Sequence, residues 1–174
     1  MSKKNILLTG PPRCGKSTLI EKIIKKIDIP ATGFFTREIR ESGQRVGFSI
    51  NTLDHRTGVL AHQDLHNRFR VGRYGVNLKD IDRIAVPAMM PDQPGMLVVI
   101  DEIGKMECFS EFFKKTLISL LDSNHRLLGS ITMKGDRFIR RIKARDDVLL
   151  VTVTLTNRDK LESMFLSNHW IDDI

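Results

Sequence analysis

The stretch Gly10-Pro11-Pro12-Arg13-Cys14-Gly15-Lys16-Ser17, continued by Thr18, decides the fold of this chain. It fits the pattern G-x-x-x-x-G-K-[ST] at every fixed position. An apolar segment, residues 5–9, precedes it directly and is predicted to be a short buried strand. Residues 16–27 follow it with apolar side chains repeating on one helical face. The sequence therefore predicts a strand, a tight turn and a helix, in that order.

Each fixed residue of this motif has a chemical task that points to phosphate binding. Gly10 and Gly15 allow backbone dihedral angles that a Cβ atom would forbid, so the loop can turn its N–H groups inward. The N-terminus of the following helix adds unpaired N–H groups and a positive dipole. Lys16 supplies a point charge for the β- and γ-phosphates, and Ser17 offers a hydroxyl to Mg²⁺. The expected nucleotide-binding residues here are Gly10, Pro11, Pro12, Arg13, Cys14, Gly15, Lys16, Ser17 and Thr18.

Two adjacent acids, Asp101 and Glu102, follow the continuous apolar run of residues 96–100. Such a run is typical of a central strand that is buried on both faces. Ligands of α/β sheets bind at the carboxyl ends of the strands, so this pair is expected beside the phosphate loop. We expect Asp101 to hold Mg²⁺, directly or through a water, and Glu102 to orient or deprotonate the attacking water. A Glu next to the magnesium-binding Asp is typical of ATPases that hydrolyse, whereas many small-molecule kinases take the base from elsewhere.

Strands and helices alternate along the chain, which predicts an α/β fold with a mostly parallel sheet and an antiparallel hairpin. No linker or repeat divides the sequence, so residues 1–174 are predicted to form a single domain. The further strands are expected at residues 33–40, 45–53, 57–61, 96–100, 127–132 and 148–154. The further helices are expected at residues 109–121, 136–144 and 159–166.

The polar segment 62–75 is predicted to be a loop, because it carries several arginines and two glycines. Asn77 has the position of a helix cap, and the helix that it starts is expected to kink or end at Pro87.

Composition narrows the class of protein further. The 174 residues are 41% hydrophobic and 28% charged, which is ordinary globular composition. Nothing approaches the apolar run of about 18 residues that a membrane span needs, and no signal peptide is visible, so we expect a cytoplasmic protein without membrane contact. The two cysteines, Cys14 and Cys108, are expected to be reduced. The net charge of +7, densest at residues 137–145, leaves three readings open: a solvated helix face, which we favour, polyphosphate contact, or nucleic-acid binding.

Taken together, these segments resemble the thermophilic nucleoside-triphosphate phosphatases and their vertebrate relatives, the cancer-related nucleoside triphosphatases. The resemblance covers nearly the whole chain, and its most specific parts are residues 101–107 and the hairpin. The matching blocks are residues 10–18, 33–40, 45–48, 70–76, 101–107 and 156–159.

This resemblance implies a three-layer α-β-α fold of the RecA-like branch and slow hydrolysis of several triphosphates to diphosphate and phosphate. It also implies that the whole block of residues 101–107 belongs to the nucleotide site, namely Asp101, Glu102, Ile103, Gly104, Lys105, Met106 and Glu107. One departure is visible, because Arg13-Cys14 stands where relatives often have smaller residues. The phosphate-loop motif is intact, but the rate of hydrolysis and the exact geometry of the loop are left open.

Other residues are candidates for the nucleotide site on weaker sequence evidence. Thr36 and Glu38 share one face of their strand and are candidates to line the cleft opposite the phosphate loop. Lys105 is expected either to touch phosphate or to pair with Glu107 at the surface. Arg158 is a candidate for stacking on the base, with helix capping by its neighbours Asn157 or Asp159 as the alternative. Candidates for the arginine that fast hydrolysis requires are Arg37, Arg73, Arg137 and Arg141.

The sequence thus predicts a Mg²⁺-dependent nucleoside triphosphatase with catalytic residues Lys16 and Glu102 and low base selectivity among ATP, GTP, CTP and UTP. A nucleotide or polynucleotide kinase is the alternative, since small α/β chains with this loop are often kinases. An RNA-associated binding module is a third reading, motivated by the positive charge. The oligomeric state is not set by these residues.

Overall fold

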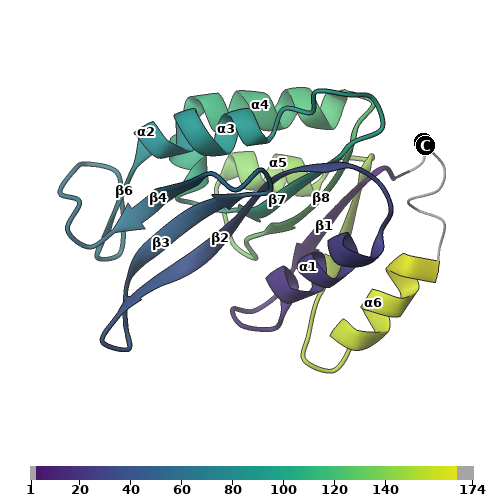
Figure 1. Ribbon diagram of the computed structural model, residues 1–174, viewed down its shortest axis with the longest axis horizontal. Helices are drawn as coiled ribbons and strands as arrows, with labels where there is room; N and C mark the ends of the chain where they lie inside the picture. The colour runs from purple at the N-terminus through teal and green to yellow at the C-terminus, as the bar shows by residue number, and fades with distance from the viewer. Residues whose placement is uncertain (1–2, 168–174) are drawn as a thin grey trace.

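The computed structural model describes residues 3–167, which form one mixed sheet between two layers of helices (Figure 1). Within these residues the nine strands lie in the order β5-β6-β4-β3-β2-β7-β8-β1-β9. The parallel part consists of β2 (Ala31–Glu41), β7 (Leu97–Ile103), β8 (Arg126–Ile131), β1 (Asn5–Thr9) and β9 (Val148–Thr152). The antiparallel part adds β3 (Gln44–Thr52), β4 (Thr57–His62), β6 (Tyr74–Val76) and β5 (Arg70–Val71).

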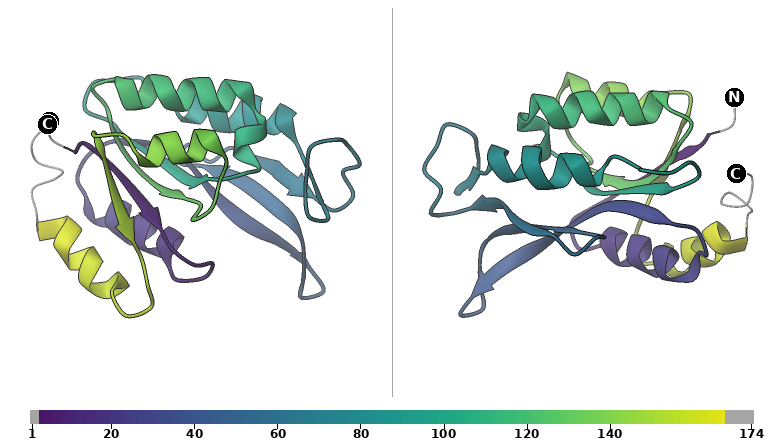
Figure 2. Two further views of the ribbon diagram at one scale, coloured as in Figure 1. Left: turned by 180° about the vertical axis from the view of Figure 1, so that it is seen from behind. Right: turned by 45° about the horizontal axis from the view of Figure 1, so that its top comes forward.

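Helices cover both faces of the sheet, as Figure 2 shows from two further sides. One layer holds α1 (Lys16–Lys26) and α6 (Arg158–Ser167). The other holds α2 (Leu78–Asp80), the π-helical turn η1 (Ile81–Ala85), α3 (Val86–Ala88), the 3₁₀ turn η2 (Glu107–Phe109), α4 (Glu111–Asp122) and α5 (Arg137–Lys143). This is the three-layer α-β-α arrangement that the sequence predicted.

Two hydrophobic clusters lie on the two faces of the sheet, and β1 contributes to both. Leu7 points into the cluster under α4 and α5, whereas Ile6 and Leu8 point into the cluster under α1 and α6. This follows from the alternation of side chains along a strand, and it explains why a continuous apolar run marks a strand buried on both faces. Phe34 and Phe113 meet edge to face in the first cluster, with ring centroids 6.4 Å apart.

Local capping sets the helix starts much as the sequence predicted. The side chain of Asn77 accepts a hydrogen bond from the N–H of Asp80, and that of Asp136 accepts one from Ile139. The helix after Asn77 continues through the five-residue π-helical turn and past Pro87, and it ends at Ala88. Irregularities within helices occur mostly at prolines and at π-helical turns, and this helix contains both.

The antiparallel part of the sheet is larger than a single hairpin with one extra strand. The prediction that residues 62–75 form a loop was wrong for residues 70–71 and 74–75, which pair as β5 and β6 and extend the sheet beyond β4. Among the described residues, four neighbouring strand pairs run parallel and four antiparallel. Strands of two and three residues are too short to show the period-two pattern from which strands are predicted.

No helix within residues 3–167 combines the length and the apolar character that crossing a bilayer would demand.

The join between the two parts of the sheet depends on Gly33, which faces Val99 across the parallel pair of β2 and β7. Gly33 has φ of +128°, and a Cβ atom there would lie 1.9 Å from the carbonyl oxygen of Val99. We therefore expect Gly33→Ala to lower the free energy of unfolding by about 2–4 kcal/mol, measured by urea denaturation.

Gly43→Ala is the matched control, because Gly43 also has a positive φ, +79°, but has open space around it at the hairpin tip. It should cost only the backbone strain, about 1 kcal/mol. Equal losses in the two variants would contradict the assignment of the close approach at Gly33.

Candidate functional site

Residues 10–15 join β1 to α1, and with the first residues of that helix they form the phosphate loop, residues 10–18, which folds around the amine of Lys16. The Lys16 amine donates to the backbone carbonyl oxygens of Gly10 and Pro11, both at 3.0 Å. Gly10 has φ of +146°, and a Cβ there would lie 2.3 Å from the carbonyl oxygen of Val153. Only glycine fits at that position. The two hydrogen bonds of Lys16 place its positive charge at the centre of the loop.

The N-terminus of α1 is open toward this loop. Gly15 occupies the cap position with φ of +103°, and no side chain in the described part of the chain caps the helix. The first turn carries no acidic residue. Its unpaired N–H groups and the helix dipole therefore favour an anion next to Lys16.

Asp101 lies at the carboxyl end of the parallel strands, near the phosphate loop. It is 1% exposed, and its Oδ1 accepts a hydrogen bond from the Ser130 hydroxyl at 2.7 Å. Burial raises the pKa of Asp101 above its usual value, and hydrogen bonds from Ser17 and Ser130 and the charges of Arg37 and Lys16 oppose that rise. Within residues 3–167 its buried Oδ2 has no hydrogen-bond partner.

This donor set fits a hard cation. The carboxyl group of Asp101 has one buried oxygen without a partner among residues 3–167, and the Ser17 hydroxyl lies beside this group. Such oxygen ligands are the ones that Mg²⁺ prefers. No group of three or more His, Cys, Asp or Glu side chains in the described part of the chain could hold a metal by itself. A metal here would therefore take most of its ligands from substrate phosphates and water, as Mg²⁺ usually does.

Glu102 and Glu107 bring two more carboxyl groups to the same place. A Cβ atom on Gly104 would lie 3.0 Å from Oε2 of Glu107 and 3.2 Å from Oε1 of Glu102, so both groups border one small space. Burial raises the pKa of Glu107 to about 8, and the charge of Glu102 adds to the rise. Burial and the charge of Asp101 also raise the pKa of Glu102, against the effect of Lys16. Glu107 therefore keeps its proton at neutral pH and adds no negative charge beside Glu102.

A cavity of about 490 Å³ brings Glu102 together with Lys16 and Ser17, and its volume is within the usual range for small-ligand sites. One wall is the phosphate loop and the start of α1, and the opposite wall is the β2–β3 hairpin. Thr36 and Glu38 are both in that second wall. The lining residues are Pro12, Arg13, Gly15, Lys16, Ser17, Thr18, Thr36, Arg37, Glu38, Arg45, Phe48, Glu102, Ser130 and Arg158.

Several residues that the sequence placed at the site lie elsewhere. Ile103 is fully buried in the core under α4, and Met106 packs against that core. Lys105 lines a different hollow, together with Cys108 and Asp136. Of the block of residues 101–107 only Glu102 lines the cavity, whereas Asp101 and Glu107 are buried beside it. The N–H of Gly104 donates to Glu107 at 3.1 Å.

The structure also separates the candidate arginines. Arg37 lines the cavity. Arg73 lies at the β5–β6 turn and donates to the carbonyl oxygen of Arg45, while Arg137 and Arg141 belong to α5 in the opposite helical layer.

Sequence reasoning missed Arg45, which lines the cavity and donates to Glu38 at 3.0 Å and to the Tyr74 hydroxyl at 3.1 Å. The predicted hairpin was the available signal, since a turn at residues 41–44 sets Arg45 opposite Arg40, which shares the face of Glu38 by strand alternation.

The residues after β9 have distinct tasks. The Asn157 side chain accepts from the N–H of Thr154 at 2.8 Å and donates to the carbonyl oxygen of Thr152 at 2.9 Å, so it fixes the connecting loop. Arg158 reaches the phosphate loop at Gly15 and lines the cavity.

Comparisons with known proteins agree with this geometry. The family model described as NTPase matches residues 5–166. A nucleoside-triphosphatase THEP1 of Thermotoga sp. strain RQ2 is 42% identical over 93% of either chain, and the human cancer-related nucleoside-triphosphatase is 36% identical over 91% of this chain and 92% of its own. The crystal structure of THEP1 from Aquifex aeolicus superposes with a TM-score of 0.85 at 30% identity, covering 94% of this chain and 97% of that one.

The buried carboxyl group of Glu107 predicts a pH-dependent stability. The folded chain keeps this proton up to about pH 8, whereas the unfolded chain loses it near 4.5. Between these values the folded state binds more protons, so stability should fall as the pH rises from 5 to 8.5. Glu107→Gln should remove on the order of 2–4 kcal/mol of that fall, measured by urea denaturation at both pH values without nucleotide.

Glu41→Gln serves as the control, because Glu41 is exposed at the end of β2. It should keep the parent pH slope. If Glu107→Gln also kept it, the protonated state of Glu107 would be wrong.

Proposed function

Since this chain belongs to the NTPase family and hydrolyses nucleoside triphosphates with a divalent metal, we propose that the reaction takes place in the cavity between residues 10–18 and the β2–β3 hairpin. The metal is Mg²⁺, and the substrates are ATP, GTP, CTP and UTP, with low selectivity for the base. The observation that supports this most strongly is that Lys16, Ser17 and Glu102 line a single cavity.

The phosphate loop binds the triphosphate. The open N–H groups at the start of α1 take the β-phosphate, because no side chain competes for them. The Lys16 amine, bonded to the carbonyls of Gly10 and Pro11, exchanges these neutral partners for the β- and γ-phosphates. A hydrogen bond from the Lys16 amine to an anionic phosphate oxygen is stronger than one to a neutral carbonyl oxygen. The amine therefore changes partners while the loop keeps its conformation.

Ser17 and Asp101 hold the metal. When bound, Mg²⁺ neutralises charge that develops on the β- and γ-phosphate oxygens. Ser130 keeps Asp101 in place through its hydrogen bond of 2.7 Å, and the free Oδ2 is the atom left for the metal or its water.

Glu102 orients the attacking water and takes its proton. Burial and the neighbouring Asp101 raise the pKa of Glu102, which brings it closer to the range of an effective general base. Glu107, uncharged beside it, keeps the local negative charge from rising further. These roles give a reaction in which water attacks the γ-phosphorus and the bond to the β-phosphate oxygen breaks.

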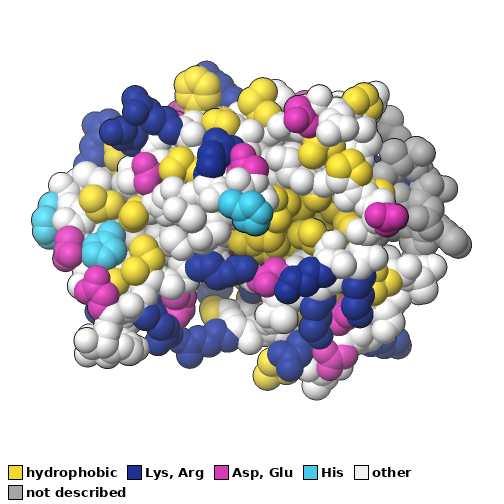
Figure 3. Space-filling view, viewed as in Figure 1, with side chains coloured by type: hydrophobic (Ala, Val, Ile, Leu, Met, Phe, Trp, Pro, Cys, Tyr) yellow, Lys and Arg dark blue, Asp and Glu magenta, His cyan; other side chains and the backbone are white. Residues whose placement is uncertain are grey.

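The kinase alternative requires a second substrate, and the relatives that match over most of this chain are named triphosphatases. Phosphate release from nucleoside triphosphate without any acceptor distinguishes the two. A nucleic-acid role is not favoured either, because the matching relatives are named triphosphatases. In Figure 3 many Lys and Arg side chains gather in the lower half of the face, with acidic side chains among them. The cytoplasmic location expected from the sequence stays a prediction.

Glu102→Gln should lower turnover of ATP about 100-fold or more, because general-base catalysis typically contributes at least that factor. Its affinity for a non-hydrolysable ATP analogue should stay within about threefold of the parent, since Gln keeps the shape of the side chain. Released phosphate and equilibrium binding are the measurements. Lys16→Ala should instead lose affinity, and parental turnover in Glu102→Gln would disprove the assignment of the base.

Arg37 is proposed to stabilise the charge that develops on the γ-phosphate. Its guanidinium lies 5.0 Å from the centre of the Phe35 ring and pairs with Glu21 at 2.5 Å, and its charge lowers the pKa of Asp101. Arg37→Ala should reduce kcat roughly 10- to 100-fold with a smaller change in KM.

Arg73→Ala provides the comparison, since Arg73 lies at the β5–β6 turn outside the lining of the cavity. Its kcat should stay within about twofold of the parent. Similar losses for the two arginines would exclude a specific role for Arg37.

A further inference from the structure

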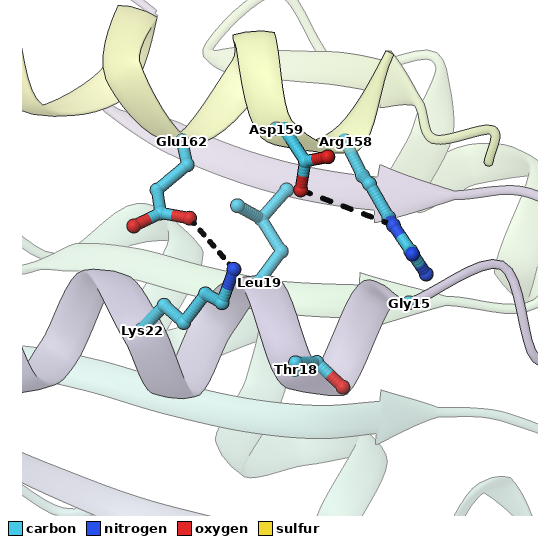
Figure 4. Close-up of a pocket in the computed structure, with 7 residues that line it drawn as sticks. All are labelled: Gly15, Thr18, Leu19, Lys22, Arg158, Asp159 and Glu162. Atoms are coloured by element: carbon cyan, nitrogen blue, oxygen red, sulfur yellow. Dashed lines mark hydrogen bonds and ion pairs between the residues drawn. The ribbon is translucent and has the colours of Figure 1, made fainter. Parts of the chain in front are cut away.

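Arg158, the first residue of α6, lies across the phosphate loop at Gly15 (Figure 4). A Cβ atom on Gly15 would meet Cδ of Arg158 at 3.1 Å and its NH1 at 3.4 Å. The Arg158 side chain is 45% exposed, and within residues 3–167 its one ion pair, with Asp159, is long at 3.9 Å. The guanidinium group is therefore beside the phosphate loop but not held by a strong anionic partner.

A second hollow, of about 140 Å³, lies on the α1–α6 side of Arg158. It is lined by Gly15, Thr18, Leu19, Lys22, Arg158, Asp159 and Glu162. A cavity of about 150 Å³ holds a benzene ring, so the volume suits one planar ring system. Its base includes Leu19, which is 3% exposed, so the hollow has an apolar floor.

The two hollows adjoin each other. Gly15, Thr18 and Arg158 line both of them. A ligand whose phosphates lie in the larger cavity can therefore extend past Gly15 into the smaller one without leaving the surface of the protein. The part of a nucleotide that lies beyond its phosphates is the sugar and the base.

The position of Arg158 is fixed by its neighbours. Asn157 ties the preceding loop to β9 through the two hydrogen bonds described above. Glu162, one turn further along α6, pairs with Lys22 at 3.0 Å and with Lys26 at 2.7 Å, and these lysines belong to α1. The start of α6 is thus anchored to the helix that carries the phosphate loop, which presents Arg158 at a defined place.

From these observations we propose that Arg158 is the platform on which the nucleobase stacks, and that the base occupies the hollow between α1 and α6. This rests on the proposed nucleotide site. A guanidinium plane stacks on the π-face that every base has, so the contact binds all four nucleotides. The order of affinity follows the stacked area, with ATP and GTP above CTP and UTP.

The experiment compares Arg158→Ala and Arg158→Lys with the parent chain, for a non-hydrolysable ATP analogue and for inorganic tripolyphosphate, which has no base. Arg158→Ala should weaken binding of the ATP analogue roughly tenfold, the factor typical of losing one base–side-chain stack. Binding of tripolyphosphate should change less than about twofold, since the stack contributes nothing to it. Arg158→Lys should resemble Arg158→Ala, because lysine keeps the charge and loses the plane.

Turnover gives an independent readout. Arg158→Ala should raise KM for ATP and GTP more than for UTP, while kcat stays within about twofold, because the base does not react. Lys160→Ala is the matched control, since Lys160 is exposed on the same helix and lines neither hollow. It should leave both binding constants and KM unchanged.

Three results would overturn the proposal. An equal loss of tripolyphosphate binding in Arg158→Ala would show that Arg158 contacts phosphate. Parental affinity in Arg158→Lys would show that only the charge matters, and parental affinity in Arg158→Ala would show that the base lies elsewhere. Failure of the parent chain to release phosphate would refute the proposed function instead, and the binding comparison would still decide the role of Arg158.

Discussion

The parallel pairing of β1 and β7 with the same strand, β8, is the constraint on which the candidate site depends. Leu8 pairs with Ser130 on one side of β8, and Ile100 pairs with Gly129 on the other. The chain therefore leaves β1 into the phosphate loop at the level where β7 reaches Asp101. In this register the Ser130 hydroxyl of β8 donates a hydrogen bond to Asp101 of β7. Residues some 90 positions apart in the sequence meet in one cavity for this reason.

Several ionisable side chains are buried next to this cavity. Their burial costs folding free energy, and packing of the core does not require it. A buried carboxylate is unfavourable unless it is paired, and Asp101 leaves one oxygen without a partner among the described residues. Glu107 avoids the cost by keeping its proton, as its raised pKa of about 8 indicates. Strongly shifted carboxyl groups that line a cleft are typical of sites where charge is handled during a reaction. The acids and Lys16 are best understood as parts of one arrangement that a phosphate and a metal complete.

The sequence was sufficient for the part of the fold that has strong local signals. The motif at residues 10–18, the apolar run before Asp101 and the cap at Asn77 each depend on neighbouring residues alone. The short strands β5 and β6 were missed because their pairing is decided by contact with β4 and not by their own pattern. Arg45 and the outward placement of Lys105 were missed for a related reason: the direction of a long side chain depends on how the hairpin and the turn after β7 sit in space. Arg158 could be proposed, since it follows the last strand, but its place over Gly15 needed the structure.

Strand β2 has a mechanical consequence for the cavity. Its first five residues, Ala31–Phe35, pair with β7 inside the parallel sheet, whereas its outer half pairs only with β3. The β3 residues opposite Thr36, Arg37 and Glu38 pair in turn with β4, so this wall of the cavity continues the sheet. Arg37 also forms an ion pair of 2.5 Å with Glu21 of α1, the helix that follows the phosphate loop. The two walls of the cavity are therefore tied to each other across one side, which sets the distance between them.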